Sequence, residues 1–379
     1  MLKNAILYFL LVLILTVGCT DPQSSGNPLE QVLASDHPKI KRVMDSIDEY
    51  QVQIRYTQIN RSGDSLKLID YDFQVNEANY FYPASTVKFP IAVLAMEKLN
   101  DIDTLDLSTR FYVEGDSVET TFAEAVSQIF AVSDNDANNR LVELLGQDVI
   151  NSRLSSKGVS PVRIAHRLGY HSDDLTTKPL IIYLNDSTTA TYEGTVNTAA
   201  KPLELNEIQK GIGFYEDGEL VNEPFDFSLK NYYPVKAQHG VLKRVIFPEQ
   251  FDESQRFNLS DAQHQYLLKT MHTLPKALGY DPVTYYDGYC KFFLYGDTTE
   301  DMEEHIKIYN KVGFAYGTLT DCAYITDSKN NVEFLLTATI LVNKDGVFND
   351  DQYEYDEIGI PFLAELGRQL YQFELNRNN

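Results

Sequence analysis

Basic residues are scarce in this sequence relative to acidic ones. The 379 residues include 32 Lys and Arg against 55 Asp and Glu, which gives a formal net charge of −23. No run of Lys or Arg is long enough to form a basic patch, and phosphate binding needs clustered basic side chains. The composition therefore argues against nucleic acid as a partner, and the acidity itself indicates solubility more than any particular ligand.

Cysteine is scarce as well. Apart from Cys19 near the N-terminus, the chain has only Cys290 and Cys322. These two could form one disulfide in an oxidising compartment or remain two buried free thiols, and the sequence leaves both possibilities open. Neither has the His or Cys neighbours that a zinc site requires. We therefore expect no metal and no cofactor.

The first apolar run, residues 5–15, is too short to span a membrane comfortably. It follows Lys3 and ends at Gly18-Cys19, so residues 1–18 fit a secretory signal peptide. The Cys resembles the lipobox cysteine of bacterial lipoproteins, although Thr16 stands where Leu is usual. The resemblance implies acylation of Cys19, a tether over residues 19–37, and an exported chain anchored to a bacterial membrane, facing the periplasm or the cell surface. The alternative is an ordinary signal peptide with an incidental cysteine.

The residues after the tether predict a discontinuous α+β domain over 38–379. A helix over about 38–50, capped by Ser35 or Asp36, precedes two strands, 52–61 and 66–74, joined by a Gly63 turn. The pattern is then helical to about residue 158, with a capping box at Thr121 and a terminal Gly146. Residues 167–258 are hard to assign.

Ser260 caps the next predicted helix, and strands over 308–326 and 332–342 precede a last amphipathic helix. Both chain ends should therefore build one antiparallel sheet flanked by helices, from residues 38–82 and 300–379. The middle, residues 83–299, should form an all-helical lobe with an insertion near 180–258.

One S-x-x-K motif, Ser85-Thr86-Val87-Lys88, begins the helical block. At a helix start, Ser85 lies where unpaired N–H groups and the helix dipole favour developing negative charge. Lys88 is one turn later on the same face, and a desolvated Lys can take the Ser proton. Alone, this motif more often describes a capped helix with a solvent-facing Lys.

Two further motifs follow in order. Ser133-Asp134-Asn135 lies between two predicted helices, where Ser133 could relay a proton and Asn135 could bind a substrate amide. Lys311-Val312-Gly313 opens a predicted strand, where Gly lets a substrate approach the backbone closely. Each is unremarkable alone, since S-D-N is commonly a cap or turn.

Together the motifs resemble those of the class A β-lactamase family of penicillin-recognising serine hydrolases, S-x-x-K, S-D-N and K-T-G. The resemblance covers most of residues 38–160 and 258–377, including Phe81-Tyr82-Pro83 before the nucleophile and Phe314-Ala315-Tyr316-Gly317 after the third motif. It implies that Ser85 is acylated, with Lys88 as its base and Ser133 as proton shuttle. It also implies substrate binding by Asn135, Lys311 and Gly313, and an oxyanion hole formed by the backbone N–H groups of Ser85 and Phe314.

The sequence departs from the family pattern at two places. Val312 replaces the hydroxyl residue of K-T-G and cannot hydrogen-bond a substrate carboxylate. The E-x-x-L-N deacylation motif is missing from residues 160–170, where His166 is the one candidate base, and Glu204-Leu205-Asn206 has the wrong spacing. Acylation can therefore persist while deacylation is slow.

Three functions fit these residues. The first is a β-lactamase-like hydrolase acting on a β-lactam or a related amide or ester. The second is a D-Ala-D-Ala peptidase or esterase, or a slowly deacylating penicillin-binding protein, with a peptidoglycan-derived substrate. The third is a catalytically weak surface lipoprotein that binds a partner.

Overall fold

A five-stranded antiparallel sheet forms the centre of the computed structural model, which describes residues 26–169 and 174–378. Its strand order is β11-β12-β13-β1-β2, so two strands from the start of the fold pair with three from its end. β1 pairs with both β2 and β13, which joins the two distant segments. The strands are β1 (Gln53–Ser62), β2 (Ser65–Phe73), β11 (Ile306–Ala315), β12 (Thr318–Asp327) and β13 (Val332–Leu341).

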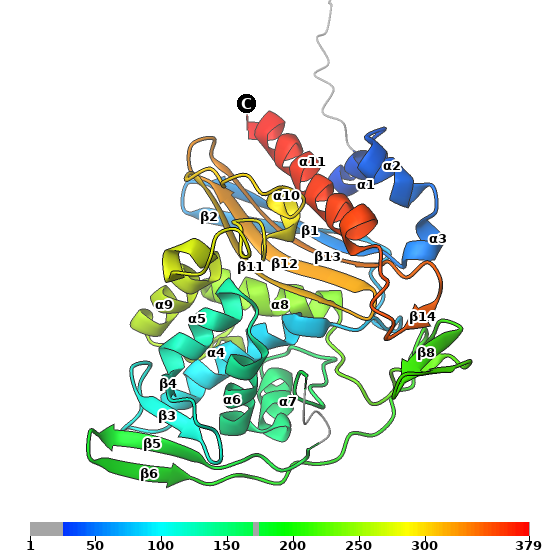
Figure 1. Cartoon of the computed structure of the whole chain (residues 1–379). Helices are drawn as coiled ribbons and strands as arrows, with labels where there is room; N and C mark the ends of the chain where they lie inside the picture. The colour runs from blue at the N-terminus through cyan, green and yellow to red at the C-terminus, as the bar shows by residue number, and fades with distance from the viewer. Residues whose placement is uncertain (1–25, 170–173, 379) are drawn as a thin grey trace, which may run out of the picture.

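Helices cover both faces of this sheet (Figure 1). One face carries α11 (Ile360–Asn378) together with α1 (Pro28–Leu33), α2 (Pro38–Met44), α3 (Ile47–Tyr50) and the short α10 (Phe292–Tyr295). Leu363 and Leu366 of α11 are fully buried against sheet residues such as Leu336. The other face meets α8 (Val235–Ile246), whose His239 bonds to sheet residues.

The helical lobe lies below the sheet in Figure 1. It is built around α4 (Lys88–Leu99), which is buried along almost its whole length. Around α4 pack α5 (Phe122–Ala131), α6 (Asn135–Leu145), α7 (Gln147–Ser156) and α9 (Asp261–His272). The α+β fold class predicted from the sequence is confirmed.

The lobe is not all-helical, however, and that detail of the prediction is wrong. It carries a four-stranded sheet in the order β4-β3-β5-β6. Phe111 of β3 pairs with Ile182 of β5, which lies 71 residues later in the unassigned segment. A pairing of such long range leaves no local signal in either strand. The strands are β3 (Arg110–Val113), β4 (Thr120–Thr121), β5 (Leu180–Asn185) and β6 (Thr188–Tyr192).

The rest of the inserted segment packs beside the central sheet. Its short strands are β7 (Gln209–Lys210), β8 (Gly213–Glu216), β9 (Glu219–Val221) and β10 (Phe225–Asp226), and β8 pairs with β14 (Val347–Phe348). Phe225 stacks with Phe348 and Tyr316, and Phe227 meets the same two rings edge-on, in an aromatic cluster that also contains Tyr82. The insertion therefore supports the segment that leads into the S-x-x-K motif.

The predicted tether is shorter than residues 19–37. Residues 28–33 form α1, and Leu29, Val32 and Leu33 are buried in the core beside α11. A helix of about a turn and a half is too short to show a clear apolar periodicity, so the sequence alone does not distinguish it from a linker. The predicted helix over 38–50 is divided into α2 and α3, and His37 stands at the N-cap of α2 without a side-chain cap bond, in place of Ser35 or Asp36.

Several local predictions are confirmed. Thr121 and Ser260 each form a capping box, and Gly146 ends α6 with a positive φ of 72°. Cys290 and Cys322 are both buried free thiols. Cys19 and the predicted signal peptide lie outside the described residues. Within residues 26–169 and 174–378, no helix is long and apolar enough to cross a membrane.

Candidate active site

Ser85 lies in a 3₁₀ turn, Ala84–Val87, that runs directly into α4. Ala84 and Val87 are buried, so the turn is fixed to the lobe core, whereas Ser85 is partly exposed. Ala84 has a positive φ of 46°, an unusual backbone conformation for a residue with a side chain. Such strain is common next to reactive groups. Ser85 borders a cavity of about 390 Å³, which we call the Ser85 cleft.

Strand β11 passes directly over this turn at Gly313. A Cβ atom on Gly313 would lie 2.7 Å from the backbone N of Ser85, 2.8 Å from Pro83 O and 2.9 Å from Thr86 N. No side chain fits in this space. Glycine therefore lets the edge strand and the Ser85 turn lie in contact, which brings the amide of Ser85 beside the strand that carries Phe314.

Lys88 and Ser133 are joined by two contacts. Lys88 Nζ donates a hydrogen bond to the backbone oxygen of Ser133 and lies 3.3 Å from Ser133 Oγ. Ser133 has a positive φ of 58° between α5 and α6. Asp134 caps α6 by accepting a bond from Ala137 N at 2.7 Å, which fixes the loop.

Lys311 approaches Ser133 from the other side. Its Nζ donates to Ser133 Oγ at 2.7 Å and to the oxygen of Val312 at 2.7 Å. Within the described residues, Lys311 makes no ion pair with a carboxylate. The hydroxyl of Ser133 is thus held between two lysine ammonium positions that lie 223 residues apart in the sequence.

Burial changes the protonation of both lysines. It lowers the pKa of Lys88 well below the ordinary lysine value, and the positive charge of Lys311 lowers it further. Burial also lowers the pKa of Lys311, to about 8. Near neutral pH, Lys88 can therefore be the neutral base and Lys311 the cation.

A buried polar network lies behind Lys311, and the sequence motifs gave no sign of it. Lys291 Nζ donates to Met271 O at 2.9 Å and to Asn310 Oδ1 at 2.6 Å. The amide of Asn310 donates to Asp321 at 2.8 Å. Burial lowers the pKa of Lys291 to about 8 and raises the pKa of Asp321 to about 6. This network fixes the strand segment next to Lys311.

The remaining predicted residues fall at different depths. Asn135 is the first residue of α6 and lines the Ser85 cleft. Phe314 lines the same cleft and is 52% exposed, so its ring is available to a ligand. Val312 is 2% exposed and belongs to the hydrophobic core under α11. Val312, which replaces the usual hydroxyl residue, therefore contributes to packing of the core.

His166 is held by the backbone through both ring nitrogens. Nε2 accepts a bond from Asn231 N at 3.1 Å, and Nδ1 donates to Arg167 O at 2.6 Å. Burial lowers the pKa of His166 to about 4. A neutral ring whose single acceptor is already occupied has no free lone pair for a substrate or water. Glu204-Leu205-Asn206 lies elsewhere, with Asn206 bonded to Asn79.

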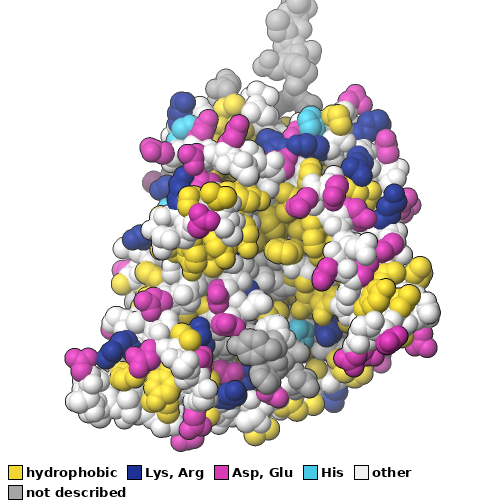
Figure 2. All heavy atoms as spheres, viewed as in Figure 1, with side chains coloured by type: hydrophobic (Ala, Val, Ile, Leu, Met, Phe, Trp, Pro, Cys, Tyr) yellow, Lys and Arg dark blue, Asp and Glu magenta, His cyan; other side chains and the backbone are white. Residues whose placement is uncertain are grey.

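One wall of the cleft comes from the segment after β13, where no site residue is predicted from the sequence. Tyr353 and Tyr355 line it together with Asn349 and Asp351. Their positions depend on the fold of a loop between distant elements, so no sequence signal could have indicated them. Figure 2 shows hydrophobic side chains gathered across the middle of the molecule, where the sheet meets the helical lobe.

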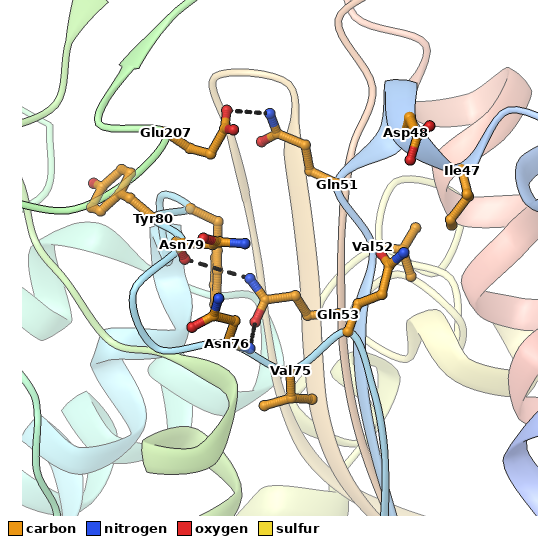
Figure 3. A pocket seen from close by; sticks show the side chains of 12 residues that line it. Ile47, Asp48, Gln51, Val52, Gln53, Val75, Asn76, Asn79, Tyr80 and Glu207 are labelled. Atoms are coloured by element: carbon orange, nitrogen blue, oxygen red, sulfur yellow. Dashed lines mark hydrogen bonds between the residues drawn. The ribbon is translucent and has the colours of Figure 1, made fainter.

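A second cavity, of about 540 Å³, lies beneath the segment that leads to Ser85 (Figure 3). Its polar side chains are largely bonded to one another or to the backbone. Gln51 Nε2 donates to Glu207 at 2.9 Å, and Gln53 bonds to the backbone of Asn76 and Asn79. The first pair joins the end of α3 to the inserted segment, and the second joins β1 to the segment after β2, so we assign this cavity a structural role.

Comparison with known proteins supports the resemblance. Residues 37–205 match a family model described as the beta-lactamase enzyme family. No curated protein matches the sequence. The family-model match covers the segment that contains Ser85, Lys88 and the S-D-N motif.

Solved structures extend the likeness to the whole fold. A beta lactamase from Xanthomonas campestris is 14% identical with a TM-score of 0.53, and the match covers 91% of this chain and 98% of that one. A beta-lactamase from Sphaerobacter thermophilus is 14% identical with a TM-score of 0.51, covering 92% and 96%. PBP-A is 14% identical with a TM-score of 0.52, also covering 92% and 96%. The predicted family resemblance is confirmed, and the chain has the fold of these proteins.

Proposed function

We propose that the protein is a serine hydrolase that forms an acyl-enzyme on Ser85 with a β-lactam or a related amide or ester. The observation that carries the proposal is the hydroxyl of Ser133 held between Lys88 and Lys311. The close packing of Gly313 on the backbone of Ser85 supports it. The lowered pKa values of Lys88 and Lys311 are consistent with this role for the pair.

The chemistry begins with neutral Lys88. It takes the proton of Ser85 as the serine oxygen attacks the carbonyl carbon, and the N–H groups of Ser85 and Phe314 stabilise the oxyanion. The carbon–nitrogen bond then breaks. Ser133 gives its proton to the leaving nitrogen and regains one from the Lys88 ammonium. The products are an ester on Ser85 and a free amine. A base of this kind contributes about 10²–10⁴ in rate.

Lys311 supplies charge in this reaction. Its ammonium lies next to Ser133 and has no carboxylate partner within the described residues. A buried charge without a counter-ion is costly, and a substrate carboxylate would relieve that cost. Asn135 at the cleft can hold the substrate amide. Substrates with a carboxylate near the scissile bond are therefore favoured.

Release of the acyl group is the slow step in this proposal. His166 has no free acceptor, and Asp351 is the only carboxylate among the described residues that line the Ser85 cleft. The site therefore favours acylation over rapid turnover, as in a penicillin-binding protein or peptidase. A fast β-lactamase is the second candidate, and the β-lactamase family match favours it.

Protein mass followed over time tests this function. The full chain in mild detergent is incubated with a penicillin, and the mass gain is located by peptide mapping. We expect one adduct on Ser85 that persists for many minutes. Ser85→Ala should abolish it, whereas Ser152→Ala, at an exposed position on α7, should not. A transient adduct with rapid penicillin loss would favour the β-lactamase. The absence of any adduct would contradict both enzymatic functions and favour the catalytically weak lipoprotein that binds a partner.

The cellular location is part of the same proposal. Acylation of Cys19 would anchor an exported chain to a membrane. Cys19→Ala should release the protein into the soluble fraction. Unchanged membrane retention would contradict the anchor.

A further inference from the structure

The wall of the Ser85 cleft opposite α6 is rich in aromatic rings. Phe314 contacts Tyr355 with ring centroids 5.6 Å apart, and Tyr355 contacts Tyr353 at 5.3 Å. Tyr316 stands edge-on to Tyr82 at 4.9 Å. All five rings line the cleft. Their π faces are electronegative, so the wall attracts cations as well as apolar groups.

The rings are held in fixed positions. The hydroxyl of Tyr355 accepts a bond from Gly317 N at 2.8 Å, and the hydroxyl of Tyr353 accepts one from Asn349 N at 2.9 Å. Tyr316 is supported from behind by Phe225 and Phe227 of the insertion, each 5.4 Å away. A ligand meets a preformed surface, which lowers the entropy cost of binding.

Asp351 adds a negative charge at this wall. It is exposed, it lines the cleft, and its φ of 58° is left-handed. Burial, together with the charges of Asp350 and Asp351, raises the pKa of Tyr353 to about 12, in line with a carboxylate close to this ring. The site is thus bipolar, with Lys88 and Lys311 buried around Ser133, outside the residues that line the cleft, and a carboxylate among the aromatic rings that do line it.

We propose that this wall binds an alkylammonium group on the acyl side of the substrate, so that the preferred substrates carry an amine-bearing acyl side chain as well as a carboxylate near the scissile bond. This inference rests on the acylation of Ser85 proposed above. An anionic side chain is disfavoured by Asp351, and a neutral one gains only the apolar contact. Ammonium and carboxylate ends then match the two ends of the cleft.

Acylation rates of matched penicillins test the inference. One set carries short unbranched alkanoyl side chains, and the other carries the same chains ending in a primary amine, with N-acetylated amines as neutral controls of equal bulk. We measure the second-order rate constant of adduct formation on Ser85 in the full chain. An exposed ion pair with a cation–π contact predicts a preference of roughly fivefold for the amine, which should shrink in 1 M salt.

Asp351→Asn is the decisive variant because Asn keeps the shape and tolerates the left-handed backbone. It should remove the preference for the amine, measured as the ratio of the rate constants for the amine and alkanoyl sets. Asp350→Asn is the matched control, since it removes a neighbouring charge from a residue that does not line the cleft, and it should keep the preference.

Four outcomes would overturn the inference. Equal rates with amine and alkanoyl penicillins would show that the wall does not select a cation, while the adduct on Ser85 would still support the proposed function. A preference for amine-bearing penicillins that survives in Asp351→Asn would also overturn it. So would an Asp351→Asn variant whose only change is slower release of the adduct. If no penicillin forms an adduct, the proposed function and this inference fail together.

Discussion

Replacing Gly313 with Ala is the sharpest test of how the site is assembled. The added methyl would lie 2.7 Å from Ser85 N, which is 0.7 Å less than the 3.4 Å at which ordinary contact begins. The three nearest atoms all belong to the backbone of residues 83–86, so no flexible side chain can move aside. Either β11 or the Ser85 turn must shift by several tenths of an ångström.

A shift of this size should affect chemistry far more than stability. Overpacking by one methyl typically costs about 1–3 kcal/mol of unfolding free energy. A reacting group misplaced by about 1 Å loses about 10²-fold in rate. We therefore expect Gly313→Ala to remain folded, with a loss of roughly 10²-fold in the rate constant for acylation of Ser85 by a penicillin.

The assay combines mass spectrometry of the adduct with thermal unfolding. Gly240→Ala on α8 is the control, because its new methyl would meet only the end of the Arg244 side chain at 3.3 Å. It should acylate at the wild-type rate. A folded Gly313→Ala protein that acylates within threefold of wild type would refute the proposed contact between β11 and the Ser85 turn.

Three further predictions concern protonation and the core. Lys88→Met should lower the acylation rate constant by about 10²–10⁴-fold. In the wild type, this rate should fall as the pH drops through the depressed pKa of Lys88, and fall again above pH 8 as Lys311 loses its proton. A flat pH profile would contradict both roles. The pKa of His166 is lower in the folded protein than in the unfolded one, so its contribution to the free energy of unfolding is present above pH 6.5 and is lost, by about 3 kcal/mol, as the pH falls toward 4. His166→Gln should remove this pH dependence in denaturant unfolding without changing the rate at which the adduct is released. A changed release rate would show that His166 takes part in deacylation. Leu29→Ala should destabilise the fold by about 2–5 kcal/mol, whereas exposed Glu30→Ala should not, and equal stabilities would show that α1 is part of the tether after all.

Features governed by neighbouring residues could be predicted from the sequence. The capping box at Thr121, the helix cap at Ser260 and the Gly63 turn depend on residues within three or four positions, and the structure has all three. The family resemblance of the three motifs also implies that their side chains act together. Ser133 and Lys311 are 178 residues apart, yet their side chains are in contact.

Features that depend on distant segments could not be predicted. The aromatic wall combines Tyr82 from before the nucleophile with Tyr353 from the loop after β13, and the insertion supports it from behind. Likewise, β3 and β5 pair across a long stretch of chain. Burial alone distinguishes Lys291 from a surface lysine, and burial is a property of the folded chain. For these features the sequence contains the residues but no local sign of their meeting.

The charge distribution explains how so acidic a protein can favour a substrate carboxylate. The net charge of −23 is spread over the whole chain, and salt screens exposed charges beyond about 10 Å. Lys311 is buried, and the nearby carboxylate of Asp321 is bonded to Asn310 and to the backbone N of Phe293. Since burial raises the pKa of Asp321 to about 6, its charge is itself held at a cost. Among the residues that the structure describes, no carboxylate forms an ion pair with Lys311, so an anionic group of the substrate is the counter-ion that we propose.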